Sequence, residues 1–202
     1  WIAFHRLIGV DRFVLYDRGS RDNTAGLIAG SRFGRQVTLI GQPRDAPQLA
    51  PYADFVANHA SRHSWAAVLD PGDFLHPLAT DSLRSLLPRY DGFSAVLLRR
   101  MVFVIPAQLR PGQLLTGSCI DRVADDSPRN ATVVTLMRVR DMQGGGGSPS
   151  TVTVAGDACD AAGQRVAAPA EWDQAPDAVL VVNRYRRIAE RQEVVADRRI
   201  AR

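Results

Sequence analysis

The spacing of apolar and polar residues changes between two periods along the first half of the chain. Apolar positions recur at helical spacing in some stretches and form short apolar runs in others. The pattern predicts, in order, a helix over residues 1–8, a strand over 12–16, a helix over 28–33, a strand over 37–40, a helix over 48–62 and a strand over 65–69. Strands that alternate with helices through short connections predict an α/β fold with a mostly parallel sheet and flanking helices.

The pattern is less regular in the second half. It predicts a helix over 82–87, strands over 95–104, 132–139, 151–155 and 178–182, and a final arginine-rich helix that begins at Asn183. Residues 106–130 mix proline, glycine, serine and acid without periodicity, which predicts a long loop. Four consecutive glycines at 144–147 predict a flexible link. We therefore expect an irregular C-terminal part with a terminal helix.

The apolar run at 65–69 has no polar alternation, which is typical of a strand that is covered on both faces. It ends at Asp70-Pro71-Gly72-Asp73. Ligands of open α/β sheets bind beyond the carboxyl ends of such strands, where Asp70 and Asp73 are expected to hold a divalent cation. The same four residues also suit a type II turn, with Pro at the second position and Gly at the third. Both interpretations are open at this stage.

The segment from Asp17 to Thr24 is rich in turn and helix-capping residues and precedes a predicted helix. Ser20 and Asp22 could cap that helix. They could also contact a ligand, because the amino end of a helix favours anions. The sequence leaves these two roles equally open.

Composition narrows the class of protein without identifying it. The chain of 202 residues suits one domain, and all 25 basic residues are arginine, giving a net charge of +4 that only weakly favours anionic ligands. Cys119 and Cys159 belong to no CxxC pattern, so neither a zinc site nor a disulfide framework is indicated, and a reducing, cytoplasmic location is expected. No apolar run reaches the length of a transmembrane segment.

Four stretches, in order, carry a resemblance to a known group of enzymes. They are WIAFHRLIGVDRFVLYDRGSRDNT at 1–24, a Q-x-x-x-Y element at Gln48 and Tyr52, WAAVLDPGDFLHP at 65–77, and VVNRYRRIAERQEVVADRRIAR at 181–202. Together they resemble blocks of the family 2 and family 92 glycosyltransferases. The resemblance implies a GT-A fold, a Rossmann-like nucleotide-sugar domain, and transfer of a sugar, with a UDP-sugar the expected donor, to a hydroxyl of a glycan or another acceptor.

The resemblance also implies roles for particular residues. Residues 1–104 would form the nucleotide-sugar half of one domain and residues 105–202 its acceptor-side half. The donor would contact Asp17, Ser20, Asp22 and Asp70. A divalent metal, Mn²⁺ or Mg²⁺, would bind Asp70 and Asp73, with Asp73 also the candidate catalytic residue. On the acceptor side the resemblance points to Arg184 and Tyr185.

The chain departs from the family pattern at three points. Gly72 stands where the family has its second Asp, and Arg184 stands where it has His. The family's first strand would precede Trp1, so we expect part of the sheet to lie upstream. These departures support an alternative hypothesis, a catalytically degenerate glycosyltransferase-like domain that binds or acts as a scaffold. Acidic residues interleave with the C-terminal arginines at helical pair spacings, so a nucleic-acid partner is not expected.

Overall fold

The computed structural model describes residues 1–110, 112–143, 154–166, 179–187 and 194–196, and the side chains of 194–196 are not considered. Its α-helices are α1 (Ile2–Leu7), α2 (Thr24–Ala29), α3 (Ala50–Asn58), α4 (Leu83–Leu86) and α5 (Leu115–Ser118). Its strands are β1 (Phe13–Asp17), β2 (Val37–Gly41), β3 (Trp65–Ala67), β4 (Asp73–Pro77), β5 (Ala95–Val104), β6 (Asp121–Val123), β7 (Val133–Arg138), β8 (Ala158–Cys159), β9 (Arg165–Val166), β10 (Leu180–Arg186) and β11 (Val194–Ala196). Short 3₁₀ turns are η1 (Gly34–Gln36), η2 (Ala60–Arg62), η3 (Leu87–Tyr90), η4 (Pro128–Asn130) and η5 (Val139–Asp141).

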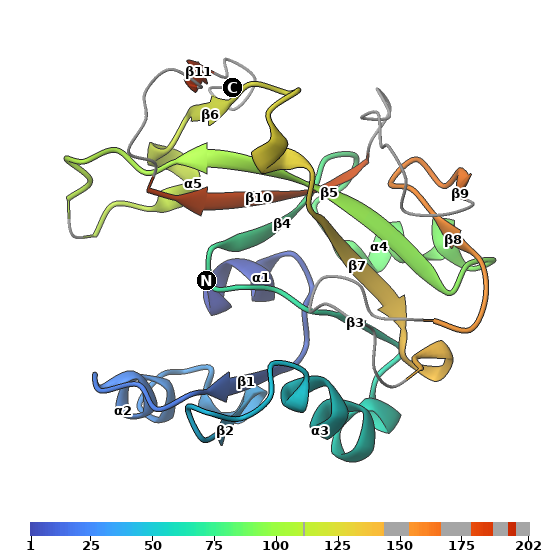
Figure 1. Ribbon diagram of the computed structural model, residues 1–202, viewed down its shortest axis with the longest axis horizontal. Helices are drawn as coiled ribbons and strands as arrows, with labels where there is room; N and C mark the ends of the chain where they lie inside the picture. The colour runs from blue at the N-terminus through green and yellow to red at the C-terminus, as the bar shows by residue number, and fades with distance from the viewer. Residues whose placement is uncertain (111, 144–153, 167–178, 188–193, 197–202) are drawn as a thin grey trace.

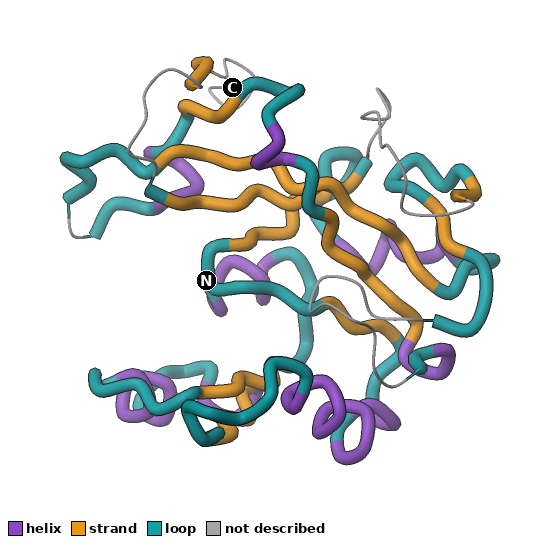
Figure 2. The backbone as a smooth tube through the Cα atoms, in the orientation of Figure 1, coloured by secondary structure: helices purple, strands orange, loops and turns teal. Residues whose placement is uncertain are grey.

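The elements form two layers (Figure 1). The lower layer holds α2, α3 and the parallel pair β1–β2, and the upper layer is built around a nine-stranded sheet. Figure 2 shows that strands dominate the upper layer, whereas helices and loops make up most of the lower one. The α/β class predicted from the sequence is therefore confirmed at this coarse level.

The large sheet is mixed, so the prediction of a mostly parallel sheet is wrong. β5 pairs in parallel with β10 and β8, but it pairs antiparallel with β6 and β7. β10 also pairs antiparallel with β4. The short strand β3, expected to be the buried centre of a parallel sheet, is only half-buried and pairs antiparallel with β7. Apolar runs identify strands but carry no information on the direction of their neighbours.

Strand β5 organises the upper layer. Its first half pairs with β7 and β8, and its second half pairs with β10 and β6. The main hydrophobic core lies against it and includes Leu75, Leu86, Tyr90, Val96, Leu98, Val134, Leu136, Leu180 and Val182. By contrast, neither β2 nor α3 in the lower layer has a fully buried residue. Most of the buried apolar surface, which drives folding, therefore belongs to the mixed sheet.

Helix α1 packs against β4 through a buried histidine. His5 is fully buried, and its Nε2 atom accepts a hydrogen bond of 3.3 Å from the backbone N–H of Leu75. Its Nδ1 atom therefore carries the proton and donates to the carbonyl oxygen of Trp1 at 3.1 Å. Burial lowers the pKa of His5 to about 4. The neutral ring is thus part of the packing between α1 and β4.

Several predictions for the second half need correction. The expected long loop contains α5, β6 and η4. The side chain of Asn130 ties this segment to β5, because its Oδ1 accepts from the N–H of Val102 and its Nδ2 donates to the carbonyl of Ala124. The final helix does not begin at Asn183, since residues 180–186 are β10 and residues 194–196 are β11. Its remaining residues, 188–193 and 197–202, lie outside the described part of the chain.

The other expected elements are found close to their predicted positions, with the exception of 28–33 and 151–155. The helix expected over 28–33 begins earlier, because α2 is Thr24–Ala29 and residues 30–33 form turns. Residues 151–153 and the glycine link at 144–147 lie outside the described residues, and Val154 forms only an isolated bridge to Met142. The two halves expected on either side of residue 104 share one sheet, because β10 lies between β4 and β5.

Within the described residues, no helix has the length and apolarity needed to cross a membrane.

Candidate functional site

Four charged side chains meet where β4 begins, and we call them the charge cluster. They are Asp70, Asp73, Arg100 and Arg184. The sheet brings them together, because Arg184 on β10 lies directly opposite Asp73 on β4, and β10 also pairs with the part of β5 that holds Arg100. Residues two apart on a strand share a face, so Arg100, which is opposite Val182, projects to the same side as Arg184.

The cluster consists of an inner and an outer ion pair. In the inner pair, Arg100 Nη2 lies 2.8 Å from Asp73 Oδ2, and the two side chains are 8% and 0% exposed. In the outer pair, Arg184 Nη2 lies 2.8 Å from Asp70 Oδ2, with side chains 28% and 54% exposed. Each arginine is also 3.8 Å from the carboxylate of the other pair. The four charges therefore alternate in sign and sum to zero.

The inner pair also organises the turn before β4. Asp73 Oδ2 accepts a second hydrogen bond of 3.1 Å from the backbone N–H of Asp70. The Asp73 carbonyl accepts from the indole Nε1–H of Trp1 at 2.7 Å. Asp73 Oδ1 and Arg100 Nε are buried and have no hydrogen-bond partner among the described residues. Removing either charge would leave the other buried with its nearest opposite charge 3.8 Å away, which is destabilising.

The sequence suggested a type II turn at Asp70–Asp73, and the structure has a turn of another type there. The N–H of Asp73 donates to the carbonyl of Asp70 at 2.9 Å, as a β-turn requires. Gly72, however, does not have the positive φ that a type II turn needs at this position. Its role is close backbone approach: its carbonyl accepts from the N–H of Tyr185 at 2.8 Å.

The donor set does not fit the expected divalent cation. Mg²⁺ and related cations bind six or more oxygen ligands, several of them carboxylates or carbonyls. Asp70 and Asp73 each have a guanidinium group beside them, so a cation between them would be repelled by both arginines. Among the described residues, no group of three or more His, Cys, Asp or Glu side chains gathers at one point. The metal therefore stays a prediction.

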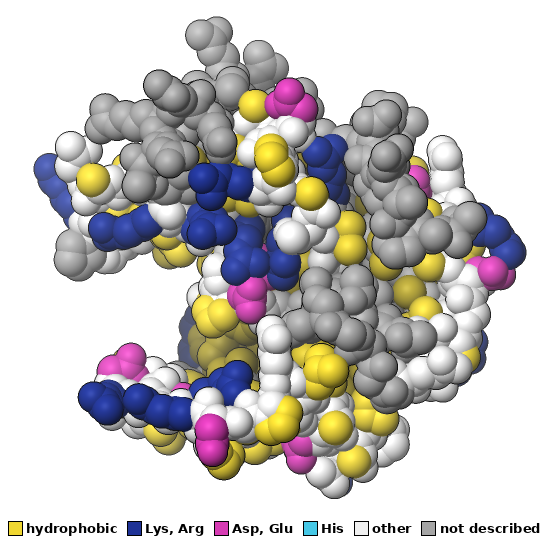
Figure 3. Space-filling model, viewed as in Figure 1, with side chains coloured by type: hydrophobic (Ala, Val, Ile, Leu, Met, Phe, Trp, Pro, Cys, Tyr) yellow, Lys and Arg dark blue, Asp and Glu magenta, His cyan; other side chains and the backbone are white. Residues whose placement is uncertain are grey.

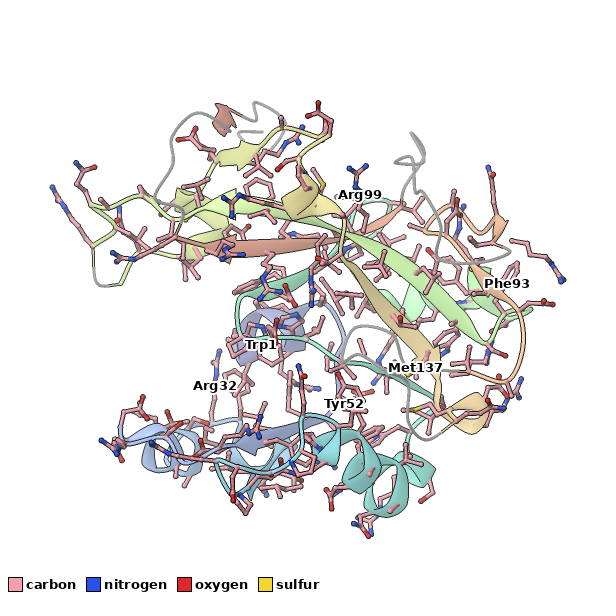
Figure 4. All side chains as sticks on the ribbon, viewed as in Figure 1. Trp1, Arg32, Tyr52, Phe93, Arg99 and Met137 are labelled. Carbon is pink, nitrogen blue, oxygen red and sulfur yellow. The ribbon has the colours of Figure 1, made fainter. Side chains whose placement is uncertain are left out.

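The charge cluster is in contact with Trp1, whose indole donates to the Asp73 carbonyl, and lies close enough to Tyr52 for Asp70 and Arg100 to influence its hydroxyl. Figure 4 places both aromatic residues beside a concave side of the molecule. Figure 3 shows a hollow between the lower layer, with α2, β1 and β2, and the upper layer, with β5, β6 and β10. Arginine side chains gather along its upper wall. The connection from β3 to β4 and helix α1 close its inner end (Figure 1). This hollow, which we call the arginine-lined hollow, is the candidate binding site.

Two aromatic residues extend the site around Asp70. Figure 4 shows Trp1 at the inner end of the arginine-lined hollow and Tyr52 rising from α3 below it. Burial, and to a smaller extent the negative charge of Asp70, raises the pKa of Tyr52 to about 12. Its hydroxyl is therefore protonated at neutral pH and can donate a hydrogen bond. Indole and phenol rings at such a position also offer flat apolar faces for a ring-shaped ligand.

The residues expected to contact a nucleotide lie apart from the cluster, at the carboxyl end of β1. Asp17 Oδ1 accepts from both the N–H and the hydroxyl of Ser20, and these bonds hold the pKa of Asp17 below its usual range. Asp22 Oδ1 accepts from the N–H and the hydroxyl of Thr24 in the same way. These are turn contacts: Ser20 bonds back to Asp17, and the N-cap residue of α2, Asn23, forms no side-chain capping hydrogen bond, so the capping interpretation is not confirmed. Nucleotide contact by Asp17, Ser20 and Asp22 stays a prediction.

The two acceptor-side candidates differ in accessibility. Arg184 is 28% exposed and pairs with Asp70, whereas Tyr185 is 4% exposed and packs in a hydrophobic cluster with Phe74 and Phe103. Neighbouring residues of a strand point to opposite faces, so both cannot line one site. The acceptor-side role remains a prediction for both residues, and only Arg184 has a surface that a ligand can reach.

Sequence reasoning missed Arg100. Arg99 and Arg100 interrupt an otherwise apolar strand. A signal was present, because arginine is seldom fully buried without a partner of opposite charge. An arginine inside a buried strand therefore indicates a buried acid elsewhere, here Asp73.

Comparison of the chain with known proteins finds no matching family model and no matching curated protein.

Proposed function

We propose that this protein is a glycosyltransferase that moves a sugar from a nucleotide-sugar donor to an acceptor hydroxyl, in polysaccharide or glycoconjugate assembly, on a GT-A type fold. The observation that carries the proposal is the partly exposed Asp70–Arg184 pair, which lies beside Trp1 and Tyr52 at the arginine-lined hollow. Such a pair presents a hydrogen-bond acceptor for sugar hydroxyls beside a donor for phosphate. The resemblance to family 2 and family 92 glycosyltransferases supports the same assignment.

The chemistry requires a base and a site for a leaving anion. Asp70 is 54% exposed and can accept the proton of the acceptor hydroxyl as its oxygen attacks the anomeric carbon. The bond from that carbon to the diphosphate breaks, and the anion leaves toward the arginine-lined wall. Asp73 is fully buried, so it acts on substrate only through Arg100 and the Asp70 turn, as a positioning residue.

A specific observation favours a second candidate, a binding domain without catalysis. Both carboxylates of the cluster are already paired with arginine, and Gly72 replaces the second Asp of the resembled motif. Such a site could retain a nucleotide sugar without activating an acceptor. This candidate predicts saturable binding with no release of free nucleotide diphosphate.

The two candidates are separated by a transfer assay with a panel of UDP-sugars and oligosaccharide acceptors, in which UDP release is measured. The enzyme hypothesis predicts acceptor-dependent release that Asp70→Asn lowers by about 10²-fold or more, the usual contribution of a general base. Asp157→Asn is the control, because Asp157 forms an exposed pair with Arg165 on β9, 2.6 Å away. Acceptor-independent or absent release, together with retained binding, would instead favour the binding domain.

A further inference from the structure

The two ion pairs of the charge cluster differ in how readily they can exchange partners. Asp73 and Arg100 are buried together, and separating them would leave charges without solvent. Asp70 and Arg184 are 54% and 28% exposed, so water can solvate both groups. Exposed ion pairs contribute little to stability, so Arg184 can leave Asp70 at small cost.

Arg184 is suited to a phosphate ligand. A guanidinium group donates in a planar fork that matches two phosphate oxygens, and such bidentate bonds are stronger than bonds between neutral groups. Its neighbour Arg100 Nη2 is 3.8 Å from Asp70 Oδ2 and adds positive potential at the same point. The backbone of Arg184 is fixed by its pairing with Asp73 and Val102 across the sheet.

The position of the arginines conflicts with a metal at this site. A divalent cation that bound Asp70 and Asp73 would need the space and the oxygen atoms that the guanidinium groups now hold. Two guanidinium groups therefore stand where the cation would, and Arg184 can turn its positive charge to a diphosphate once it leaves Asp70.

We infer that Arg184 binds the diphosphate of the donor directly by exchanging Asp70 for phosphate oxygens, so that donor binding requires no divalent cation. The inference rests on the proposed function, whose donor contains this diphosphate. The exchange releases the Asp70 carboxylate, which can then accept from the acceptor hydroxyl. Free Asp70 and bound diphosphate are both negative, so Asp70 opposes the binding of the anion while serving the transfer.

Removing the charge of Asp70 should therefore have opposite effects at the two kinds of site. It should tighten diphosphate binding at an arginine site and weaken it at a metal site in which Asp70 is a ligand. Calorimetry would measure the Kd of UDP, and in parallel of inorganic pyrophosphate, in EDTA and then in Mn²⁺. We expect the Kd values in the two buffers to agree within about twofold and Arg184→Gln to raise both by about tenfold or more, as for loss of a charged hydrogen bond. Asp70→Asn should tighten binding by about threefold, because it removes a nearby like charge.

The controls separate this effect from general changes. Arg165→Gln removes an exposed arginine of another Asp–Arg pair and should leave both Kd values unchanged. Melting temperatures would report whether Arg184→Gln folds. If it does not, Asp70→Asn carries the test, because Asp70 is more exposed than Arg184.

The outcomes distinguish this inference from the proposed function. UDP binding that appears only with Mn²⁺, or that Asp70→Asn weakens, would overturn the inference and leave sugar transfer intact. Arg184-dependent binding of pyrophosphate without any transfer from UDP-sugars would overturn the proposed function and retain the anion site. If neither UDP nor pyrophosphate binds, both are wrong.

Discussion

Replacing Gly72 by alanine tests the backbone contact that sets the charge cluster. A Cβ atom at Gly72 would lie 2.8 Å from the carbonyl oxygen of Tyr185, closer than real Cβ contacts. The neighbour is backbone, so no side chain can rotate to make room. The N–H of the same Tyr185 donates to the carbonyl of Gly72, and the two segments are therefore held together where the methyl group would be added.

The cost follows from the required displacement. Relieving the contact means moving β10 and the turn apart by about half an ångström, and overpacking of this kind costs about 1–3 kcal/mol. Alanine also lowers the conformational entropy of the unfolded chain, which stabilises the folded protein by about 0.4–1 kcal/mol. The net loss is about 0–2.6 kcal/mol, or a melting temperature up to about 10 °C lower for a chain of this size.

Thermal unfolding followed by circular dichroism would measure this change. Gly92→Ala is the matched control, because a Cβ at Gly92 meets nothing within 4 Å and its φ is not positive. We expect Gly92→Ala to melt at or slightly above the wild-type temperature. A Gly72→Ala variant as stable as Gly92→Ala would refute the reasoning. Gly72→Asp would add the same Cβ, which gives a physical reason why the second aspartate of the resembled motif is absent.

Three further predictions concern groups outside the site. Burial lowers the pKa of His5 from 6.5 to about 4, so the free energy of unfolding should be highest above pH 6.5 and fall by about 3 kcal/mol as the pH drops to 4. Melting curves across that range would measure the change, and a flat profile would contradict a buried neutral ring. Asn130→Ala should cost about 1–3 kcal/mol in urea unfolding, since it leaves the buried N–H of Val102 unpaired, and unchanged stability would show that water replaces the amide. Tyr16→Phe removes a hydrogen bond of 2.8 Å that lowers the pKa of Asp54, so NMR titration should show that pKa rise, whereas no change would exclude this contact as the cause.

The sequence predicted local elements well and their partners poorly. The strand at 95–104 and the helix that Ser82 caps are found where the apolar pattern indicated, because both depend on neighbouring residues. The direction of pairing depends on contacts between distant segments, so the mixed sheet could not be read from the same pattern. β4 was missed because its apolar residues follow directly after a turn that resembled a ligand loop.

In the candidate site, too, individual residues were predicted from the sequence but their partners were not. The motif at 65–77 pointed to Asp70 and Asp73, and both belong to the charge cluster. Their partners were not predictable from spacing, because Arg100 and Arg184 come from strands that pair only in the folded sheet. Arg184 was noted as a departure from the resembled motif, and residues 183–186 of the final helix assigned to it belong to β10.

The place of β10 between β4 and β5 also determines when the protein can finish folding. β4 and β5 are both synthesised before residue 105, yet the strand that joins them ends at Arg186. At about 5–20 residues per second, a ribosome needs roughly 4–16 seconds to cross that interval. During this time the strands that flank the gap present unpaired edges, which favour association with other chains. A chain shortened before residue 180 would keep these edges permanently, so truncation from the C-terminal side should cause aggregation as well as loss of the Arg184 site.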